Sequence, residues 1–237
     1  MNPFFLGTFF KCEGMAILDK TTFFYRSLIQ LGLFLTSFHC FGNTIDHNKH
    51  PAYLGFVAGY GSTTWDGLVP SKANQNFAMN LSTPTEVREG GATWGFYGGY
   101  ELNPFFAFEL SYQRYPDAQV TFDEISLFTF LNNGMTEFTT HTETINLMAK
   151  VMVTIPSTDI KLYSSAGAAE VHRSDVLFER WRLSPTFSAG FNHDFTQHIM
   201  GELGANYTAG YGEAQLNPTE VYFPFLYSIF VRIGYRI

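Results

Sequence analysis

Apolar and polar side chains alternate most clearly in the last eleven residues, Tyr227 to Ile237. Apolar residues occupy every odd position: Tyr227, Ile229, Val231, Ile233, Tyr235 and Ile237. The even positions hold Ser228, Phe230, Arg232, Gly234 and Arg236. Because successive side chains of a strand point to opposite faces, this pattern predicts a β-strand with one wholly apolar face and one face that carries two arginines.

Seven further segments have the same strand-like pattern. They are Tyr53–Thr64, Ala92–Leu102, a third that begins at Phe105, a fourth that ends at Ile155, Ile160–Val171, Ser184–Phe195 and a seventh that follows residues 196–198. Their length, about ten to thirteen residues, fits the ~9–11 residues of a tilted membrane strand better than the five or six of a soluble strand.

The connections between these segments alternate in length. Short turns follow the second, fourth and sixth segments, and longer loops follow the first, third, fifth and seventh. Outer-membrane barrels have short periplasmic turns and long outer loops. The sequence therefore predicts an all-β fold, an eight-stranded antiparallel up-and-down transmembrane β-barrel with both termini periplasmic. A soluble lipocalin-like barrel, with the aromatic faces inside, is the alternative.

The low content of charged residues and the negative net charge indicate which classes of partner are excluded. Charged residues make up 15% of the chain and the formal net charge is −7, which argues against nucleic acid because phosphate binding needs a basic surface. We expect no cofactor and no metal centre.

The N-terminal residues 1–42 resemble a targeting segment, and residues 43–237 are expected to form the barrel domain. Lys20 and Arg26 precede the apolar stretch 28–35, as in a secretory signal, and Met15 is a candidate start. Cys12 and Cys40 are the only cysteines. A mature chain without them has no thiol to mispair during export.

Six ionisable residues fall on the predicted polar faces. They are Glu101, Glu109, Lys150, Glu202, Arg232 and Arg236. The interior of an eight-stranded barrel is just wide enough for side chains to fill, and a buried charge is costly unless it is paired. We therefore predict a salt-bridge network that plugs the lumen, in which Glu109 or Glu202 pairs with Lys150 and Arg232. A gated ion path is the alternative.

Aromatic residues near the predicted strand ends are expected to anchor the barrel at the membrane interfaces. They are Tyr53, Trp65, Trp94, Tyr112, Tyr207, Tyr211, Tyr227 and Tyr235.

The second long loop is rich in β-forming residues. Gln119–Leu131 and Thr136–Thr144 are separated by the hairpin signal at 132–134, so the third and fourth strands are expected to continue as a ribbon beyond the membrane. Three alternatives remain open for this loop: a ribbon that binds a ligand, packing against the first loop from Trp65 to Gly91, and a short helix. The residues considered for binding are Phe122, Phe128, Phe130 and Phe138.

Two histidine patterns raise the question of catalysis or metal binding. His172 and Ser174 share one strand face, which resembles the His-x-Ser pair of lipid A deacylases, but no matching glutamate is expected on the next strand, and Glu179 is assigned to a loop. A serine without an oriented base is poorly activated. His141 and Glu143 share a face, but two ligands are too few for a metal site. The chain is therefore predicted not to be an enzyme.

Residues 50–237 resemble the small eight-stranded outer-membrane barrels, the OmpA transmembrane domain and the OmpX family. The terminal strand is similar to the signal that the barrel assembly machinery recognises, although it ends in Ile237 rather than Phe or Trp. The resemblance implies a Gram-negative outer-membrane protein in contact with lipid and lipopolysaccharide. Its expected role is adhesion, contact with a host or surface ligand, or envelope integrity. A narrow OmpW-like channel and a lipid A-modifying enzyme are the alternatives.

Overall fold

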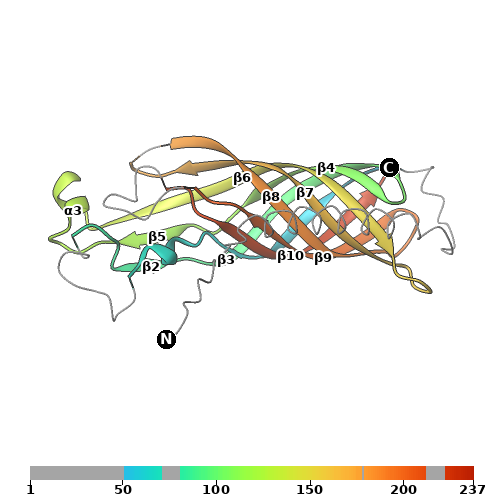
Figure 1. Ribbon diagram of the computed structural model, residues 1–237, viewed down its shortest axis with the longest axis horizontal. Coiled ribbons are helices and arrows are strands. Elements are labelled where there is room, and N and C mark those ends of the chain that lie inside the picture. The colour runs from blue at the N-terminus through green and yellow to red at the C-terminus, as the bar shows by residue number, and fades with distance from the viewer. Residues whose placement is uncertain (1–50, 71–80, 178, 212–221) are drawn as a thin grey trace, which may run out of the picture. The chain divides into compact units, whose positions relative to one another are not determined.

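The computed structural model describes residues 51–70, 81–177, 179–211 and 222–237 (Figure 1). The proposed targeting segment, residues 1–42, lies outside the described residues. The elements are β1 (Ala52–Ser62), η1 (Trp65–Leu68), β2 (Glu86–Arg88), β3 (Gly91–Asn103), β4 (Phe106–Arg114), β5 (Ala118–Thr121), α3 (Leu127–Leu131), β6 (Glu137–Thr154), β7 (Ile160–Ser174), β8 (Glu179–Asp194), β9 (Ile199–Thr208) and β10 (Leu226–Arg236).

Eight of these strands form a closed antiparallel barrel. The hydrogen-bonded order runs β6-β4-β3-β1-β10-β9-β8-β7, and the pairing of β6 with β7 closes the ring. The first and last strands of the barrel meet in this ring, since Tyr53 of β1 is opposite Arg236 of β10. Closure leaves every barrel strand with two neighbours, which removes the open sheet edge that hydrocarbon does not tolerate. The predicted eight-stranded barrel is confirmed.

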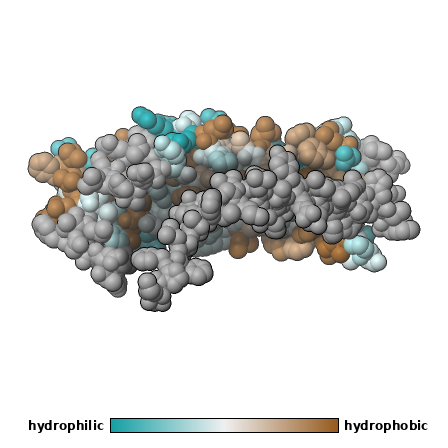
Figure 2. Space-filling model, viewed as in Figure 1, coloured by the Kyte–Doolittle hydropathy of each residue, from teal (hydrophilic) through white to brown (hydrophobic). Residues whose placement is uncertain are grey.

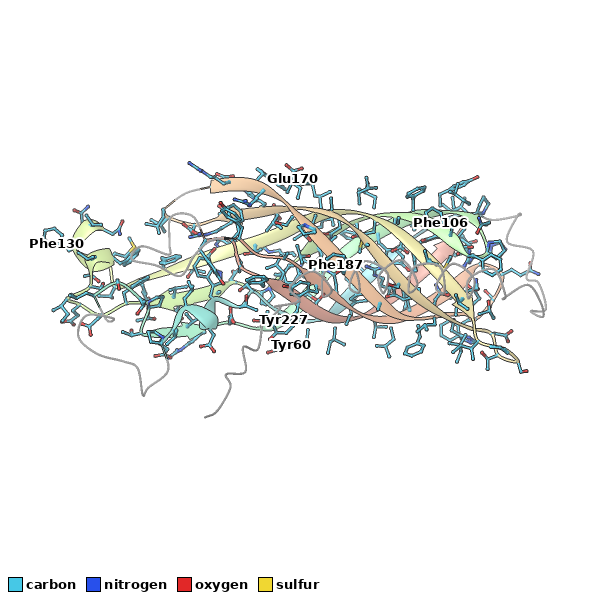
Figure 3. The ribbon with its side chains drawn as sticks, in the orientation of Figure 1. Tyr60, Phe106, Phe130, Glu170, Phe187 and Tyr227 are labelled. Carbon is cyan, nitrogen blue, oxygen red and sulfur yellow. The ribbon has the colours of Figure 1, made fainter. Side chains whose placement is uncertain are left out.

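The alternation seen in the sequence corresponds to the outside and the inside of this barrel. Along β10 the odd residues from Tyr227 to Tyr235 are exposed, and the even residues from Leu226 to Arg236 are buried. Tyr60, Phe187 and Tyr227, labelled in Figure 3, are exposed on the barrel wall, and Figure 2 shows hydrophobic residues along the upper and lower edges of the molecule. In the part of the chain described, no helix is long and apolar enough to cross a membrane.

The two rims differ, with one departure from the sequence prediction. Short turns at residues 104–105, 155–159 and 195–198 form one rim, here called the turn rim, where β1 begins and β10 ends. The opposite rim, the loop rim, carries the longer connections at 63–90, 115–136 and 209–225. The connection between β7 and β8 was expected to be long but spans only 175–178, because both strands continue beyond their predicted ends as a paired hairpin.

The second outer loop is a ribbon with a helix at its far end. β5 pairs with the beginning of β6, and β2 adds to β5 as a third strand. The predicted hairpin turn at 132–134 is wrong. The helix α3 occupies Leu127–Leu131, and residues 132–134 form the end of this helix. Gly134 has a φ of 85°, and its N–H donates to the carbonyl of Thr129 at 2.9 Å, so the left-handed residue terminates a helix rather than forming a tight strand turn.

Inward-facing glycines make room for tyrosine rings in the lumen. A Cβ at Gly99 would lie 2.5 Å from the hydroxyl of Tyr53, and a Cβ at Gly234 would lie 2.5 Å from the hydroxyl of Tyr97. Tyr53 and Tyr97 are in turn in edge contact, with ring centroids 6.0 Å apart. These close approaches explain why glycine is needed at positions that point into a narrow barrel.

We predict that Gly99→Ala destabilises the barrel by about 1–3 kcal/mol, because the added methyl group forces Tyr53 to move in a packed interior. Gly98→Ala is the matched control: its Cβ would point outward and lie 3.3 Å from its nearest neighbour. The urea midpoint of the chain folded in lipid vesicles measures both. Equal midpoints for the two variants would contradict this explanation of Gly99.

Candidate functional site: the filled lumen and the outer extension

Four charged side chains form a closed cluster in the middle of the lumen. Lys150 Nζ lies 2.9 Å from Glu109 Oε1 and 2.5 Å from Glu202 Oε2. Arg232 Nη1 lies 3.0 Å from Glu109 Oε2 and 3.1 Å from Glu202 Oε1. Each carboxylate therefore contacts both cations, where the sequence analysis expected only one of the two carboxylates to do so. The Lys150 side chain is 0% exposed, and a charge so buried is tolerated only with such partners.

A second charged cluster lies next to the turn rim. Arg236 Nη2 lies 2.8 Å from Glu101 Oε1 and 3.0 Å from Asp194 Oδ1. Lys161 Nζ contacts the other oxygen of Asp194 at 3.0 Å. Lys161 and Asp194 are not among the interior residues predicted from the sequence. The signal for Asp194 was its even spacing from the inward-facing Asn192, whereas the small residues that follow Lys161 left the orientation of β7 ambiguous.

The charges of the two clusters balance. The four carboxylates Glu101, Glu109, Asp194 and Glu202 face the four cations Lys150, Lys161, Arg232 and Arg236. Tyr53 adds a hydrogen bond, because its hydroxyl donates to Glu109 Oε1 at 2.7 Å. The sequence analysis assigned Tyr53 to interfacial anchoring. That assignment is wrong, since Tyr53 has the inward parity of β1 and lies buried in the lumen.

Toward the loop rim the charged filling of the lumen gives way to neutral and apolar side chains. From the turn rim, the inward residues of β10 are Arg236, Gly234, Arg232, Phe230, Ser228 and Leu226. Ser228 accepts a hydrogen bond from Gln113 Nε2 at 3.0 Å. Leu226 belongs to a buried apolar cluster with Tyr115, Ala169, Val171 and Phe223. The charged layers therefore lie between the turn rim and this buried apolar cluster, which has threonines such as Thr144 and Thr208 beside it.

Beyond the loop rim the chain builds a second hydrophobic core. We call the residues of η1, β2, β5 and α3, with β6 residues 137–140, the outer extension. The buried residues of this core, which Tyr222 joins from the last loop, are Trp65, Leu68, Ala118, Val120, Phe122, Phe128, Phe138 and Tyr222. Phe122 stacks on Phe128 with ring centroids 4.1 Å apart, and Trp65 meets Tyr222 edge-on at 4.9 Å. Segments of three outer connections are thus packed into one unit.

A buried arginine links this core to the top of β7. The Arg173 guanidinium lies 4.5 Å from the centre of the Trp65 ring, its Nε donates to Asp175 Oδ2 at 2.7 Å, and its Nη1 donates to the carbonyl oxygen of Tyr222. Burial raises the pKa of the Tyr222 hydroxyl, which donates to the carbonyl oxygen of Thr64. Trp65 is therefore a core residue and not an interfacial anchor, which corrects the sequence assignment.

The loop phenylalanines separate into two groups. Phe122, Phe128 and Phe138 are buried in the outer core, so their proposed role as exposed binding residues is wrong. The alternative that they pack against the first loop is confirmed, because Trp65 and Leu68 are in the same cluster. Phe130 of α3, labelled in Figure 3, is 83% exposed.

The remaining proposed anchors lie on the barrel exterior. Trp94, Tyr207 and Tyr227 are exposed on the wall near the loop rim, and Tyr235 is exposed near the turn rim. Aromatic residues at both ends of the apolar band are typical of transmembrane barrels. The terminal-strand residues Tyr227, Ile229, Val231, Ile233, Tyr235 and Ile237 all face outward. Their role as an assembly signal stays a prediction.

His172 has a glutamate neighbour that the sequence analysis did not expect. It pairs in register with Glu143 on β6, and its Nδ1 lies 3.0 Å from Glu143 Oε1. Its Nε2 lies 3.2 Å from Oε1 of Glu179, which begins β8 rather than lying in a loop. Both ring nitrogens of His172 therefore contact carboxylates.

His141 is not placed as a metal ligand. Its Nδ1 lies 2.7 Å from Asp117 Oδ1, while Glu143 accepts from the hydroxyl of Tyr112 and contacts His172. Across the described ranges no three histidine, cysteine, aspartate or glutamate side chains gather in a metal-binding arrangement.

We predict that Arg232→Met lowers the free energy of unfolding by about 3–5 kcal/mol, because it leaves two buried carboxylates facing Lys150 alone. The double variant Arg232→Met/Glu202→Gln restores the charge balance and should recover at least half of that loss. Urea unfolding in lipid vesicles measures both variants. A double variant no more stable than the single one would show that charge balance does not govern the lumen.

We predict that Trp65→Ala loosens the outer extension and leaves the barrel folded. Removing a buried tryptophan costs about 3–5 kcal/mol, and here the loss falls on the core beyond the membrane. Limited proteolysis should cut within 115–136 sooner than in the unmodified chain, with the heat-dependent gel shift of the barrel retained. Trp181→Ala is the control, because Trp181 is an exposed tryptophan of β8. This variant should be cut at the same rate as the unmodified chain.

Comparison with known proteins identifies the family. The outer membrane protein beta-barrel domain matches residues 33–228, and no curated protein matches the chain. Neisserial surface protein A is 13% identical over 78% of this chain and 97% of its own, with a TM-score of 0.47. The barrel domain of Pseudomonas aeruginosa OprF is 14% identical over 79% of this chain and 98% of its own, with a TM-score of 0.43. The outer membrane protein AlkL is 15% identical over 84% of this chain and 95% of its own, with a TM-score of 0.46. The chain belongs to the outer membrane protein beta-barrel domain family and is a small eight-stranded integral protein of the bacterial outer membrane.

Proposed function

We propose that this protein is a non-enzymatic barrel with a closed lumen, and that its outer extension makes contact with a ligand or another surface outside the cell. The observation that carries the proposal is the filling of the barrel. Two charge-balanced clusters, the hydrogen bond between Gln113 and Ser228, and the buried apolar cluster around Leu226 occupy the lumen from the turn rim to the loop rim. A continuous path for ions would have to disrupt these contacts.

The outer extension supports a role at the cell surface. A passive membrane anchor needs only short connections at the loop rim. Here β6 is 18 residues long and continues beyond the barrel to support β5 and β2. A dedicated hydrophobic core holds this extension in one conformation, and rigid loops on a stable scaffold are the usual location of binding residues. We infer that short turns and both termini face the periplasm, which directs the extension away from the cell.

Conductance in a planar lipid bilayer tests the closed lumen. We expect the unmodified chain to show no large, stable conductance. Arg232→Met and Arg236→Met should remain closed or open only briefly, because the apolar cluster around Leu226 is unchanged. Large, stable single-channel currents from the unmodified chain would instead support the narrow channel that the sequence analysis kept as its alternative.

Adhesion of whole cells tests the role of the outer extension. A variant in which a two-residue Asn-Gly turn replaces residues 117–139 removes β5 and α3. Gram-negative cells that display the unmodified chain should adhere to cultured host cells about tenfold more than cells that display this shortened variant. The heat-dependent gel shift confirms that both barrels are folded. Equal adhesion by folded barrels would count against surface contact as the function.

A further inference from the structure

The helix α3, at the far end of the outer extension, has both buried and exposed apolar side chains. Phe128 points into the outer core and is buried, while Leu127, Phe130 and Leu131 are exposed. The three exposed residues have the i, i+3, i+4 spacing that places side chains on one face of a helix. Ile125, just before the N-cap, is also exposed. Single exposed apolar residues are ordinary, but a contiguous group marks an interaction site.

The structure holds this apolar face in a fixed position. Ser126 caps α3, since its hydroxyl accepts from the N–H of Thr129 at 3.1 Å. The N–H of Leu127 donates to the carbonyl of Leu81 at 2.8 Å, which ties the helix to the first loop. The side chain of Asn132 donates to the carbonyl oxygen of Phe128 at 2.8 Å. A preorganised surface loses little conformational entropy when it binds a partner.

The charged residues nearest this face in the sequence are all acidic. From residue 115 to residue 149 the chain contains no lysine or arginine. The carboxylates in the same stretch are Asp117, Asp123, Glu124, Glu137 and Glu143. Asp123 and Glu124 immediately precede the apolar face, and Glu124 is exposed. On β2, Arg88 is occupied by an ion pair with Glu86 at 2.9 Å. An acidic rim attracts a cationic partner and repels an anionic one.

We propose that the exposed face of α3 is a docking site for a protein that offers an apolar surface bordered by lysine or arginine. Leu127, Phe130 and Leu131 contact the apolar surface, and Asp123 and Glu124 meet the basic border. This proposal rests on the proposed function, of which it names the contact residues and the partner class. Figure 1 shows α3 at the end of the extension opposite the C-terminus, and Figure 2 shows hydrophobic residues gathered at that end. Anionic lipid would be repelled, and a zwitterionic bilayer offers no net positive charge to match the rim.

A pair of synthetic peptides tests the two chemical requirements of the site. The first is an amphipathic helix with leucine on one face and lysine beside it, and the second carries glutamate in place of lysine. Each is titrated against the full chain in phosphatidylcholine nanodiscs, with empty nanodiscs subtracted. We expect the lysine peptide to bind at least tenfold more tightly than the glutamate peptide. Raising the salt concentration should weaken the lysine peptide's binding, because exposed charges are screened.

Substitutions in α3 test whether the lysine peptide binds to this helix. The triple variant Leu127→Ser/Phe130→Ser/Leu131→Ser should lower affinity for the lysine peptide at least tenfold, and Glu124→Lys should also lower it. Phe130→Leu should keep most of the affinity. Val176→Ser is the matched control, because Val176 is an exposed apolar residue of the outer β7–β8 connection. It should bind the peptide as the unmodified chain does.

Several results would overturn the proposal. They are equal affinity of both peptides, unchanged affinity of the triple variant, docking of the chain onto phosphatidylcholine vesicles that depends on Phe130, or a dimer of the chain that the triple variant dissociates. Whole-cell adhesion separates this proposal from the proposed function. If the variant shortened at 117–139 loses adhesion and the triple variant keeps it, the function stands and the docking site is wrong. If neither loses adhesion, the proposed function itself fails.

Discussion

Hydrocarbon offers no hydrogen bonds to a polypeptide backbone, and this constraint determines most of the structure. A sheet can cross a membrane only if its first and last strands also pair. In this chain β10 returns to β1 and β6 pairs with β7, so the sheet has no edge within the barrel. Once the ring is closed, the two-residue period of each strand assigns every second side chain to lipid and the others to a narrow interior.

The narrow interior then determines which residues can be charged. Water has little room between the walls, so a charge in the lumen must find its counter-charge among the other inward side chains. Glu109, Glu202, Lys150 and Arg232 meet this requirement together, since each carboxylate contacts both cations. The same ion pairs join strands that are distant in sequence across the lumen. The pairing that makes the charges tolerable is therefore also the pairing that, in the proposed function, closes the path through the barrel.

Beyond the loop rim the surroundings change from lipid to water, and the packing rule changes with them. The long strand β6 continues, but its buried face now packs against the first and last loops instead of lining a lumen. Phe138 is buried on this face next to Trp65 and Phe122. An apolar residue left exposed there is unusual, which is why the exposed face of α3 stands apart from the rest of the extension.

The amino-acid sequence by itself determined the barrel, because alternation and loop length are local properties of the chain. The orientation of β10 and the inward positions of Glu101, Lys150 and Arg232 follow directly from strand parity. Only the tertiary structure decided which charges meet, since the stagger between strands sets how Glu109 and Arg232 approach across the lumen. It also decided that Tyr53 and Trp65 are buried, that α3 replaces a hairpin, and that Glu143 contacts His172. Each of these depends on partners far away in the sequence, and a pattern read along one strand carries no information about them.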